Sequence, residues 1–312
     1  MTIQDLAREA AAQWGGTPLA LIRNRENAVF RMALPNGKHA ALRLHRMGYQ
    51  TKAAIASELW FCGALADNGL PVPRPLPAQN GADLVTVQGG RMATAVEWLP
   101  GAPLGEAGVP LAGSAADQAA QHHALGQLLA RIHSATLSLN LPSTFDRPSW
   151  DIDGLTGETP FWGRFWDHAA LTKPERDQMQ SARQFLRAAL QTHAKTTPII
   201  PVHADVLREN ILVDGKALSL IDFDDSGLGF PLYDLGTVLS QNLYEPAFAD
   251  IRDALIAGYK GLRPTDAAMV DIFTLARCLA SVGWTMPRLA PDDPIMRSHI
   301  ARALLCAKRV MA

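Results

Sequence analysis

The spacing of apolar residues over the first hundred positions predicts two helices and five strands. Apolar residues recur every three or four positions over residues 3–14 and 52–68, which is the period of a helix with one buried face. Shorter apolar runs bounded by turn residues predict strands at residues 19–22, 28–34, 40–45, 84–88 and 92–98. Hairpins in this order indicate an antiparallel sheet of about five strands with one helix packed on it.

After Leu99-Pro100-Gly101 the pattern becomes mainly helical. The helical period covers residues 115–133, 176–193, 235–241, 248–259, 267–283 and 296–310. One hairpin interrupts these helices, because residues 211–213 and 218–221 are apolar and Asp214-Gly215 between them is a favoured turn pair. The fold class is therefore α+β, and we expect a small sheet-rich lobe at residues 1–99 and a larger helical lobe at residues 100–312.

Composition and charge exclude several classes of protein. The 312 residues include 29 Lys+Arg and 30 Asp+Glu, a balance that argues against a strongly basic nucleic-acid binder. Three scattered cysteines without a CxxC pair argue against a disulfide framework or a cysteine-built zinc site. Charged residues interrupt the N-terminal segment, and no apolar run approaches the ~20 residues of a membrane span. We expect a cytoplasmic monomer or homodimer without a nucleic-acid or membrane partner.

The densest group of polar residues surrounds the late hairpin. Residues 202–210 read VHADVLREN, and residues 222–225 read DFDD. Because a hairpin returns its ends to one place, we expect Asn210 and Asp222 to lie near each other, with Asp205 on the adjoining loop. An amide oxygen and a carboxylate suit Mg²⁺ when substrate phosphates complete its shell. A further carboxylate that accepts a proton from a hydroxyl completes the set of groups that phosphoryl transfer needs.

This pattern, H-x-D-x-x-x-x-N followed by a hairpin and an I-D-F segment, resembles the catalytic core of the aminoglycoside phosphotransferase and choline kinase family, which includes type II homoserine kinases. Residues 99–101 resemble its hinge between lobes, and LGQLLARIHS at residues 125–134 resembles the first long helix of its large lobe. The resemblance implies a protein-kinase-like fold with ATP held between two lobes. It also implies that Asp205 is the catalytic base and that Asn210 and Asp222 bind Mg²⁺.

The resemblance implies supporting roles for three further residues near the hairpin. His203 would be structural, packing against and hydrogen-bonding the catalytic loop. Asp234 stands where the family has an acid that braces this loop, and it also suits the N-cap of the next helix; both interpretations stay open. Asp224 stands where many kinases have glycine, and it would add to the metal site or face the substrate.

The small lobe carries the residues that the resemblance assigns to the nucleotide. The family's phosphate-gripping lysine is replaced by Arg43, which is always charged but not interchangeable with lysine. Glu58 would be its ion-pair partner, or else a solvated charge on the helix. The loop before the second strand lacks G-x-G-x-x-G, so backbone N–H groups near Asn27 would reach phosphate, unless the loop is an ordinary polar hairpin. Glu97 and Leu99 would offer backbone groups to adenine.

The residues that face the acceptor are less clearly marked. Residues 161–166 read FWGRFW, and they form either a packing patch between helices or a pocket wall in which Arg164 contacts an anionic group. Three acids either face an amine or belong to a solvated loop: Asp146, Asp151 and Asp153. The acceptor we expect is a hydroxyl of a small molecule.

Other functions remain as alternatives to this ATP- and Mg²⁺-dependent transfer. The closest is a protein serine/threonine kinase of the same fold. A metal-dependent phosphohydrolase is more distant and rests on the likeness of residues 222–226 to a D-x-D-x-[TV] nucleophile loop. A nucleotide-binding pseudokinase is a further alternative, and the arginine at position 43 is the single feature of the sequence that supports it.

Overall fold

The computed structural model describes residues 2–24, 27–290 and 293–312. The chain divides into two compact units. The first unit contains the residues up to Gly101 together with Leu139–Arg147 and Ser219–Asp224, and the second contains Ala102–Ser138, Pro148–Leu218 and Asp225–Ala312. The first unit thus takes in the expected small lobe and also two later segments. In the loop before the second strand, Arg25 and Glu26 lie outside the described residues.

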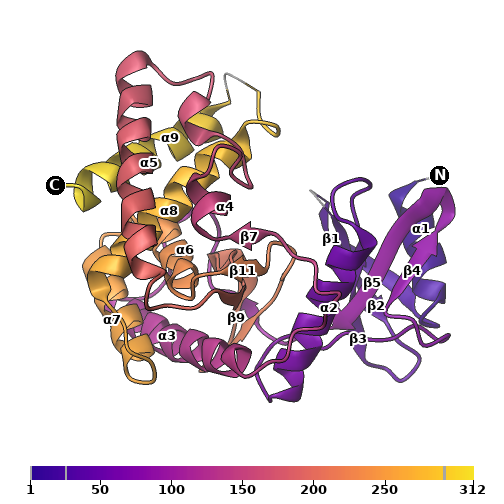
Figure 1. Cartoon of the computed structure of the whole chain (residues 1–312). Coiled ribbons are helices and arrows are strands. Elements are labelled where there is room, and N and C mark those ends of the chain that lie inside the picture. Colours follow the sequence, from indigo (N-terminus) through magenta and orange to yellow (C-terminus); the bar gives the residue numbers. More distant parts are fainter. Residues whose placement is uncertain (1, 25–26, 291–292) are drawn as a thin grey trace. The chain divides into compact units, whose positions relative to one another are not determined.

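The first unit is built on a five-stranded antiparallel sheet with the strand order β1-β2-β3-β5-β4 (Figure 1). Its strands are β1 (Thr17–Asn24), β2 (Ala28–Ala33), β3 (His39–Leu44), β4 (Leu84–Val87) and β5 (Arg91–Glu97). Alternate residues of β2 and β3 are buried, as expected for a sheet with one face in a core. The predicted antiparallel sheet is therefore confirmed.

Two helices belong to the first unit. Helix α1 (Ile3–Ala12) packs Ala7, Ala10 and Ala11 into the same core cluster as the buried residues of β2 and β3. Helix α2 (Lys52–Asp67) buries the predicted apolar face, and it also buries Glu58. The sequence predicted one helix packed on the sheet and did not predict that α1 packs on it as well. Its alanines give α1 a flat face that can approach the strands closely.

The second unit is mainly helical, as predicted. Its helices are α3 (Ala115–Leu137), α4 (Ile152–Thr156), α5 (Lys173–His193), α6 (Leu232–Asn242), α7 (Phe248–Lys260), α8 (Ala267–Thr285) and α9 (Pro294–Val310). Helices α3 and α7 pack so closely that a Cβ at Gly126 would lie 2.2 Å from the carbonyl oxygen of Leu255. Against the expectation from the sequence, helix α8 is long and apolar enough to cross a membrane. Its most apolar 18 residues have a mean hydropathy of 1.3, but 72% of this stretch is buried inside the protein, as in a core helix.

Short strands complete the second unit and position the polar loops. The predicted hairpin is present as β9 (Ile211–Asp214) and β10 (Ala217–Leu220), in a sheet of order β10-β9-β6 with β6 (Ala102–Pro103). The last two residues of β10, Ser219 and Leu220, are counted with the first unit. A second sheet has the order β7-β11-β8, formed by β7 (Ser149–Trp150), β8 (Ile200–Val202) and β11 (Gly227–Gly229). The sequence did not predict these strands, because two or three residues are too few to show a period.

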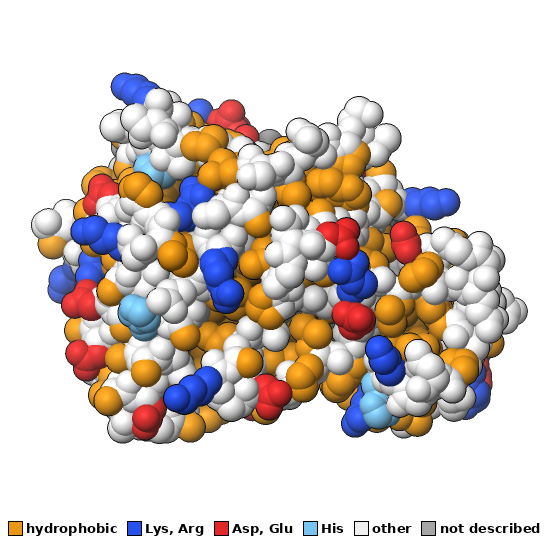
Figure 2. Space-filling model, turned by 90° about the horizontal axis from the view of Figure 1, so that it is seen from below, with side chains coloured by type: hydrophobic (Ala, Val, Ile, Leu, Met, Phe, Trp, Pro, Cys, Tyr) orange, Lys and Arg blue, Asp and Glu red, His pale blue; other side chains and the backbone are white. Residues whose placement is uncertain are grey.

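Charged side chains of both signs lie on the face of the molecule that Figure 2 presents. Basic and acidic side chains are interspersed there. This arrangement agrees with the near-zero formal net charge of −1.

Candidate active site

The loop between β8 and β9 carries the predicted base and is held by a buried acid. Asp234, in the first turn of α6, accepts hydrogen bonds from the backbone N–H groups of His203 (3.1 Å) and Ala204 (2.7 Å). Ala204 has φ +63°, a left-handed conformation that costs a residue with a Cβ energy unless its surroundings hold it. The Asp234 carboxylate supplies that support by fixing two consecutive N–H groups.

Asp234 is itself held from the opposite side. Nε2 of His133 lies 2.8 Å from its Oδ2, and Nδ1 of the same ring lies 2.9 Å from the hydroxyl of Tyr259. All three side chains are buried. The N-cap of α6 is Pro231 rather than Asp234. Of the two interpretations that the sequence left open, these contacts are those of a brace.

Asp205 has a donor on each carboxylate oxygen. Its Oδ2 accepts a 2.8 Å hydrogen bond from Nδ2 of Asn210, and its Oδ1 lies 2.6 Å from Nη2 of Arg277. The Asp205 side chain is 18% exposed, so the carboxylate is held in place and still accessible. Nδ1 of His203 accepts a hydrogen bond from the N–H of Asp205, which ties that imidazole into the loop.

Asn210 is oriented in a way that suits a cation. Its Nδ2 donates both to the backbone oxygen (2.9 Å) and to the carboxylate of Asp205. Because the nitrogen faces Asp205, Oδ1 is the atom that Asn210 presents to any other partner. The side chain is fixed just before β9 by the short helical turn Arg208–Asn210.

In the first unit, Arg43 gathers three carboxylates from distant parts of the sequence. Its Nη1 lies 2.6 Å from Oε1 of Glu58, and its Nη2 lies 2.8 Å from Oδ1 of Asp222. Asp224 is farther, with its Oδ1 3.7 Å from Nη1. Burial acts to lower the pKa of Arg43, but the negative charges of Glu58, Asp222 and Asp224 outweigh it and raise that pKa above its usual value. Glu58 is therefore a buried ion-pair partner rather than a solvated charge.

The acids of this Arg43 cluster differ in their environments. The side chain of Asp222 is 35% exposed, and its φ is +65°. Asp224 is buried, which raises its pKa to about 7, and the neighbouring Glu58 and Asp222 act in the same direction. Nδ2 of Asn27 donates a 3.1 Å hydrogen bond to Oδ2 of Asp224. Asn27 thus supports this acid through its side chain.

The residues expected to contact adenine lie at the end of the sheet. Glu97 closes β5, and its N–H donates a 2.9 Å hydrogen bond to the backbone oxygen of Arg74. The N–H of Glu97 is therefore already paired in this structure. Leu99 follows two positions later, near the end of the first unit's main segment.

Sequence reasoning missed two arginines. Arg147 is buried and donates to the backbone oxygens of Phe223 and Asp224, as well as to Ala54. Arg277 reaches Asp205 from 72 positions later in the chain. A usable signal did exist for Arg277, because it is a charged residue within the apolar run of helix α8.

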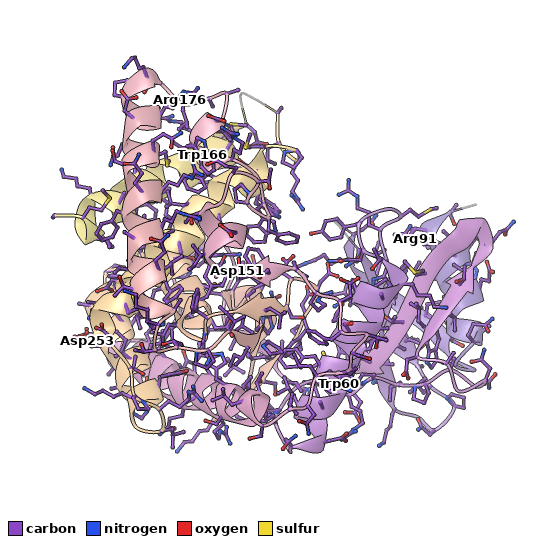
Figure 3. All side chains as sticks on the ribbon, viewed as in Figure 1. Trp60, Arg91, Asp151, Trp166, Arg176 and Asp253 are labelled. Carbon is purple, nitrogen blue, oxygen red and sulfur yellow. The ribbon has the colours of Figure 1, made fainter. Side chains whose placement is uncertain are left out.

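The contacts of the aromatic segment at residues 161–166 are packing contacts and ion pairs, and the pocket-wall interpretation stays a prediction. Trp166 is buried, and Cζ of Arg183 lies 3.9 Å from its ring centroid. The backbone oxygen of Trp166 accepts a hydrogen bond from Arg176, and both residues are labelled in Figure 3. Arg164 pairs with Asp167. Trp162 also has an arginine over its ring, because Cζ of Arg277 lies 4.5 Å from the ring centroid.

The three acids for which the sequence left open an amine partner or a solvated loop have structural partners. Asp151 caps helix α4 through a 2.8 Å hydrogen bond from Gly154, and Asp153 pairs with Arg187 at 2.9 Å. Asp146, in the first unit, accepts a 3.4 Å hydrogen bond from Thr51. All three contacts are of the kind expected of loop and helix-end acids.

Known proteins similar to this chain include phosphotransferases. Residues 19–269 match the model of the phosphotransferase enzyme family. Homoserine kinases from Acidiphilium cryptum and Pseudomonas aeruginosa are 27% and 28% identical to this chain, covering 80% and 85% of it and 76% and 78% of their own lengths.

Solved structures show the same similarity. A microcompartment-associated aminopropanol kinase has a TM-score of 0.82 and 26% identity, with 98% of this chain and 97% of that chain covered. An amicoumacin kinase solved with AMP-PNP and Ca²⁺ has a TM-score of 0.77 at 18% identity, with 99% and 93% covered, which supports the fold. The chain therefore belongs to the phosphotransferase enzyme family, and it is a small-molecule phosphotransferase with the protein-kinase-like fold.

Proposed function

We propose that this enzyme transfers the γ-phosphoryl group of ATP to a hydroxyl of a small molecule, with Asp205 as the base and Mg²⁺ as the metal. The observation that carries the proposal is the geometry of Asp205. A carboxylate held by donors on both oxygens, yet partly exposed, can orient an incoming hydroxyl and accept its proton. His203 and Asp234 keep the backbone of this loop in place.

For the metal, we propose Asn210 and Asp222 as ligands. The donor types fit, because Mg²⁺ prefers oxygen, and Asn210 has its amide oxygen turned away from Asp205 while Asp222 is partly exposed. The described residues contain no group of three or more His, Cys, Asp or Glu that would hold a metal alone. Nucleotide phosphates would therefore complete the shell. When bound, the metal would neutralise charge on the phosphates that react.

For the nucleotide, we propose Arg43 as a phosphate contact, with Glu58 fixing its orientation. Arginine presents five N–H donors, so the two used on Glu58 and Asp222 leave others for phosphate oxygens. Asn27 and the connector residues Glu97 and Leu99 are proposed as further contacts to the nucleotide. Asp224 supports the metal loop.

For the acceptor, we propose an amino alcohol as the first class to test. Relatives and structural neighbours carry the names homoserine kinase, aminopropanol kinase and choline/ethanolamine kinase family protein. Each acceptor so named combines a hydroxyl with an amine or ammonium group. We also propose that the enzyme acts in the cytoplasm without a nucleic-acid or membrane partner.

A transfer assay tests the proposal directly. The purified protein is incubated with γ-labelled ATP, with and without Mg²⁺, and with homoserine, 1-amino-2-propanol, ethanolamine and choline in separate reactions. We expect label in one or more of these compounds only when Mg²⁺ is present. In a further reaction, the enzyme and γ-labelled ATP are added to a bacterial lysate. Label in the proteins of that lysate, together with no label in any of the small molecules, would favour the protein-kinase alternative.

A further inference from the structure

Arg277 is a buried cation that no motif singled out. It lies on α8, whose other buried residues are mostly apolar, and its side chain is 6% exposed. Removing a guanidinium from water is costly unless specific partners replace the lost hydration. The partners of Arg277 therefore indicate what the residue does.

The guanidinium of Arg277 lies between an acid and an aromatic ring. Its Nη2 is 2.6 Å from Oδ1 of Asp205, and its Cζ is 4.5 Å from the ring centroid of Trp162. The ring of Trp162 is in turn packed edge-on against Trp150, at 4.8 Å between centroids. Burial acts to lower the pKa of Arg277, yet Asp205, Tyr233 and Asp225 raise it above the usual value. Arg277 thus stays charged and has little room to move.

This arrangement fixes the rotation of the Asp205 carboxylate. Asn210 holds Oδ2 and Arg277 holds Oδ1, so the two donors together determine the plane of the group. With Asn210 alone, the carboxylate could turn about the bond to its Cβ. Each carboxylate oxygen has two acceptor sites, so the contact with Arg277 still allows Oδ1 to accept the proton of a substrate hydroxyl.

We propose that Arg277 is a positioning residue for phosphoryl transfer, holding the carboxylate of Asp205 in the orientation that meets the acceptor hydroxyl, and that Trp162 holds Arg277 in place. This rests on the proposed function, in which Asp205 is the base. An error of ~1 Å in the position of a reacting group can cost about 100-fold in rate. The role is therefore expected to appear in kcat rather than in nucleotide binding.

A merely structural role makes different predictions. If Arg277 only anchored α8 to the loop, its removal would lower stability and would act independently of the chemistry of Asp205. If it acts through Asp205, its removal has little further effect once the carboxylate is gone. The combination of Arg277→Met with Asp205→Asn separates these cases.

The experiment measures kcat, the KM for ATP and the KM for the acceptor by γ-labelled ATP transfer. The acceptor is the panel compound with the highest turnover, or water as ATP hydrolysis if no panel compound accepts label. The variants are Arg277→Met, Arg277→Lys, Trp162→Phe, Trp162→Ala, Asp205→Asn and the double variant. Arg252→Met is the matched control. Arg252, on α7, makes a paired contact with Asp271 of α8, the helix that carries Arg277, and makes none with Asp205.

We expect Arg277→Met to lower kcat about 100-fold, with the KM for ATP unchanged within about threefold. Arg277→Lys should recover part of kcat, because lysine keeps the charge but not the planar fork. Trp162→Ala should lower kcat more than Trp162→Phe, and Arg252→Met should leave kcat unchanged. In the Asp205→Asn background, Arg277→Met should change the residual rate by less than about threefold.

Two results would overturn the inference. One is an Arg277→Met variant that keeps wild-type kcat. The other is an equal fold-loss from Arg277→Met with and without the Asp205 carboxylate, which would show a structural role. Wild-type activity of Asp205→Asn would instead refute the proposed function, so the two failures are distinguishable.

Discussion

The carboxylate of Asp234 accepts a 2.7 Å hydrogen bond from the backbone N–H of Ala204, a residue 30 positions earlier that has a left-handed backbone. A second N–H, from His203, reaches the other oxygen of the same carboxylate. The conformation of the loop next to the proposed base thus depends on one buried acid on a separate helix.

Asp234→Asn should destabilise the protein markedly. In the variant, an NH₂ group replaces one carboxylate oxygen and faces the buried N–H of His203 or Ala204, which is itself a donor. A buried donor left without an acceptor in this way costs about 3 kcal/mol. Urea unfolding measures the loss. Asp266→Ala is the control, because Asp266 is an exposed N-cap of α8 and its loss should cost only about 1 kcal/mol. Equal losses in the two variants would contradict the bracing role.

Asp205→Asn should abolish most of the transfer and leave nucleotide binding intact. Asparagine has nearly the same shape but cannot accept a proton, so we expect kcat to fall about 10²–10⁴-fold. Calorimetric titration with Mg·ATP should give a Kd within about twofold of the wild type, because the proposed role of Asp205 is toward the acceptor and not the nucleotide. A variant with full activity would disprove the assignment of the base.

Asp222→Asn should remove the effect of Mg²⁺ on nucleotide binding. Asparagine is the better probe than alanine, because Asp222 has φ +65° and asparagine tolerates that conformation. Thermal unfolding with ATP, with and without Mg²⁺, measures the effect. Asp214→Asn, at the exposed end of β9, is the control and should behave as the wild type does. If Mg²⁺ still enhanced stabilisation by ATP in Asp222→Asn, the ligand assignment would be wrong.

Arg43→Met should destabilise the first unit. It leaves Glu58 buried, with a side chain only 6% exposed, and without its cation, a situation that typically costs about 3–5 kcal/mol. Adding Glu58→Gln removes the stranded charge, so the double variant should be more stable than Arg43→Met alone. Denaturant unfolding of the three proteins checks this order. A double variant less stable than Arg43→Met would show that Glu58 does not depend on Arg43.

His45 should make stability fall at acid pH. Burial, helped by the nearby charges of Arg43, Arg91 and Arg147, lowers the pKa of His45 from 6.5 to about 3. Below pH 6.5 the unfolded chain therefore binds a proton that the folded chain does not, and the free energy of unfolding falls by up to about 1.4 kcal/mol per pH unit. This contribution to stability is fully present above pH 6.5.

His45→Gln tests this pH dependence. Glutamine does not titrate and can still donate to Thr94, the hydrogen-bond partner of His45. Between pH 7 and pH 5 the variant should lose about 2 kcal/mol less unfolding free energy than the wild type. Urea unfolding at the two pH values measures the difference, and parallel losses would contradict it.

Much of the fold was predictable because long elements carry a period. The helices of the second unit and the five strands of the first repeat their apolar residues often enough to be recognised. Strands β7, β8 and β11 were not, since pairing between distant segments creates them and no local pattern announces it. The packing of α1 was missed for a related reason, because alanine favours a helix without indicating what the helix covers.

The candidate site, like the fold, was predictable only in part. Asp205, Asn210 and Asp222 were proposed from their spacing around one hairpin and from the family resemblance, and their roles stay predictions. Arg277 and Arg147 were not, because their partners lie far away in sequence and only the folded chain brings them together. For Asp234, the sequence could not choose between a cap and a brace, since both roles place an acid at the start of a helix. The hydrogen bonds to His203 and Ala204 supply what the sequence lacked.

The discontinuous make-up of the first unit has a consequence for the order of events at the ribosome. Its sheet is encoded before Gly101, yet Ser219–Asp224 belongs to the same unit, and Asp222 follows its partner Arg43 by 179 positions. A nascent chain can pair Arg43 with Glu58 early, but this unit stays incomplete until most of the second has been translated. Domains commonly fold one after another during synthesis. Here the first unit begins to be synthesised first but is completed late. A product truncated before residue 219 would therefore contain Arg43 and Glu58 without Asp222.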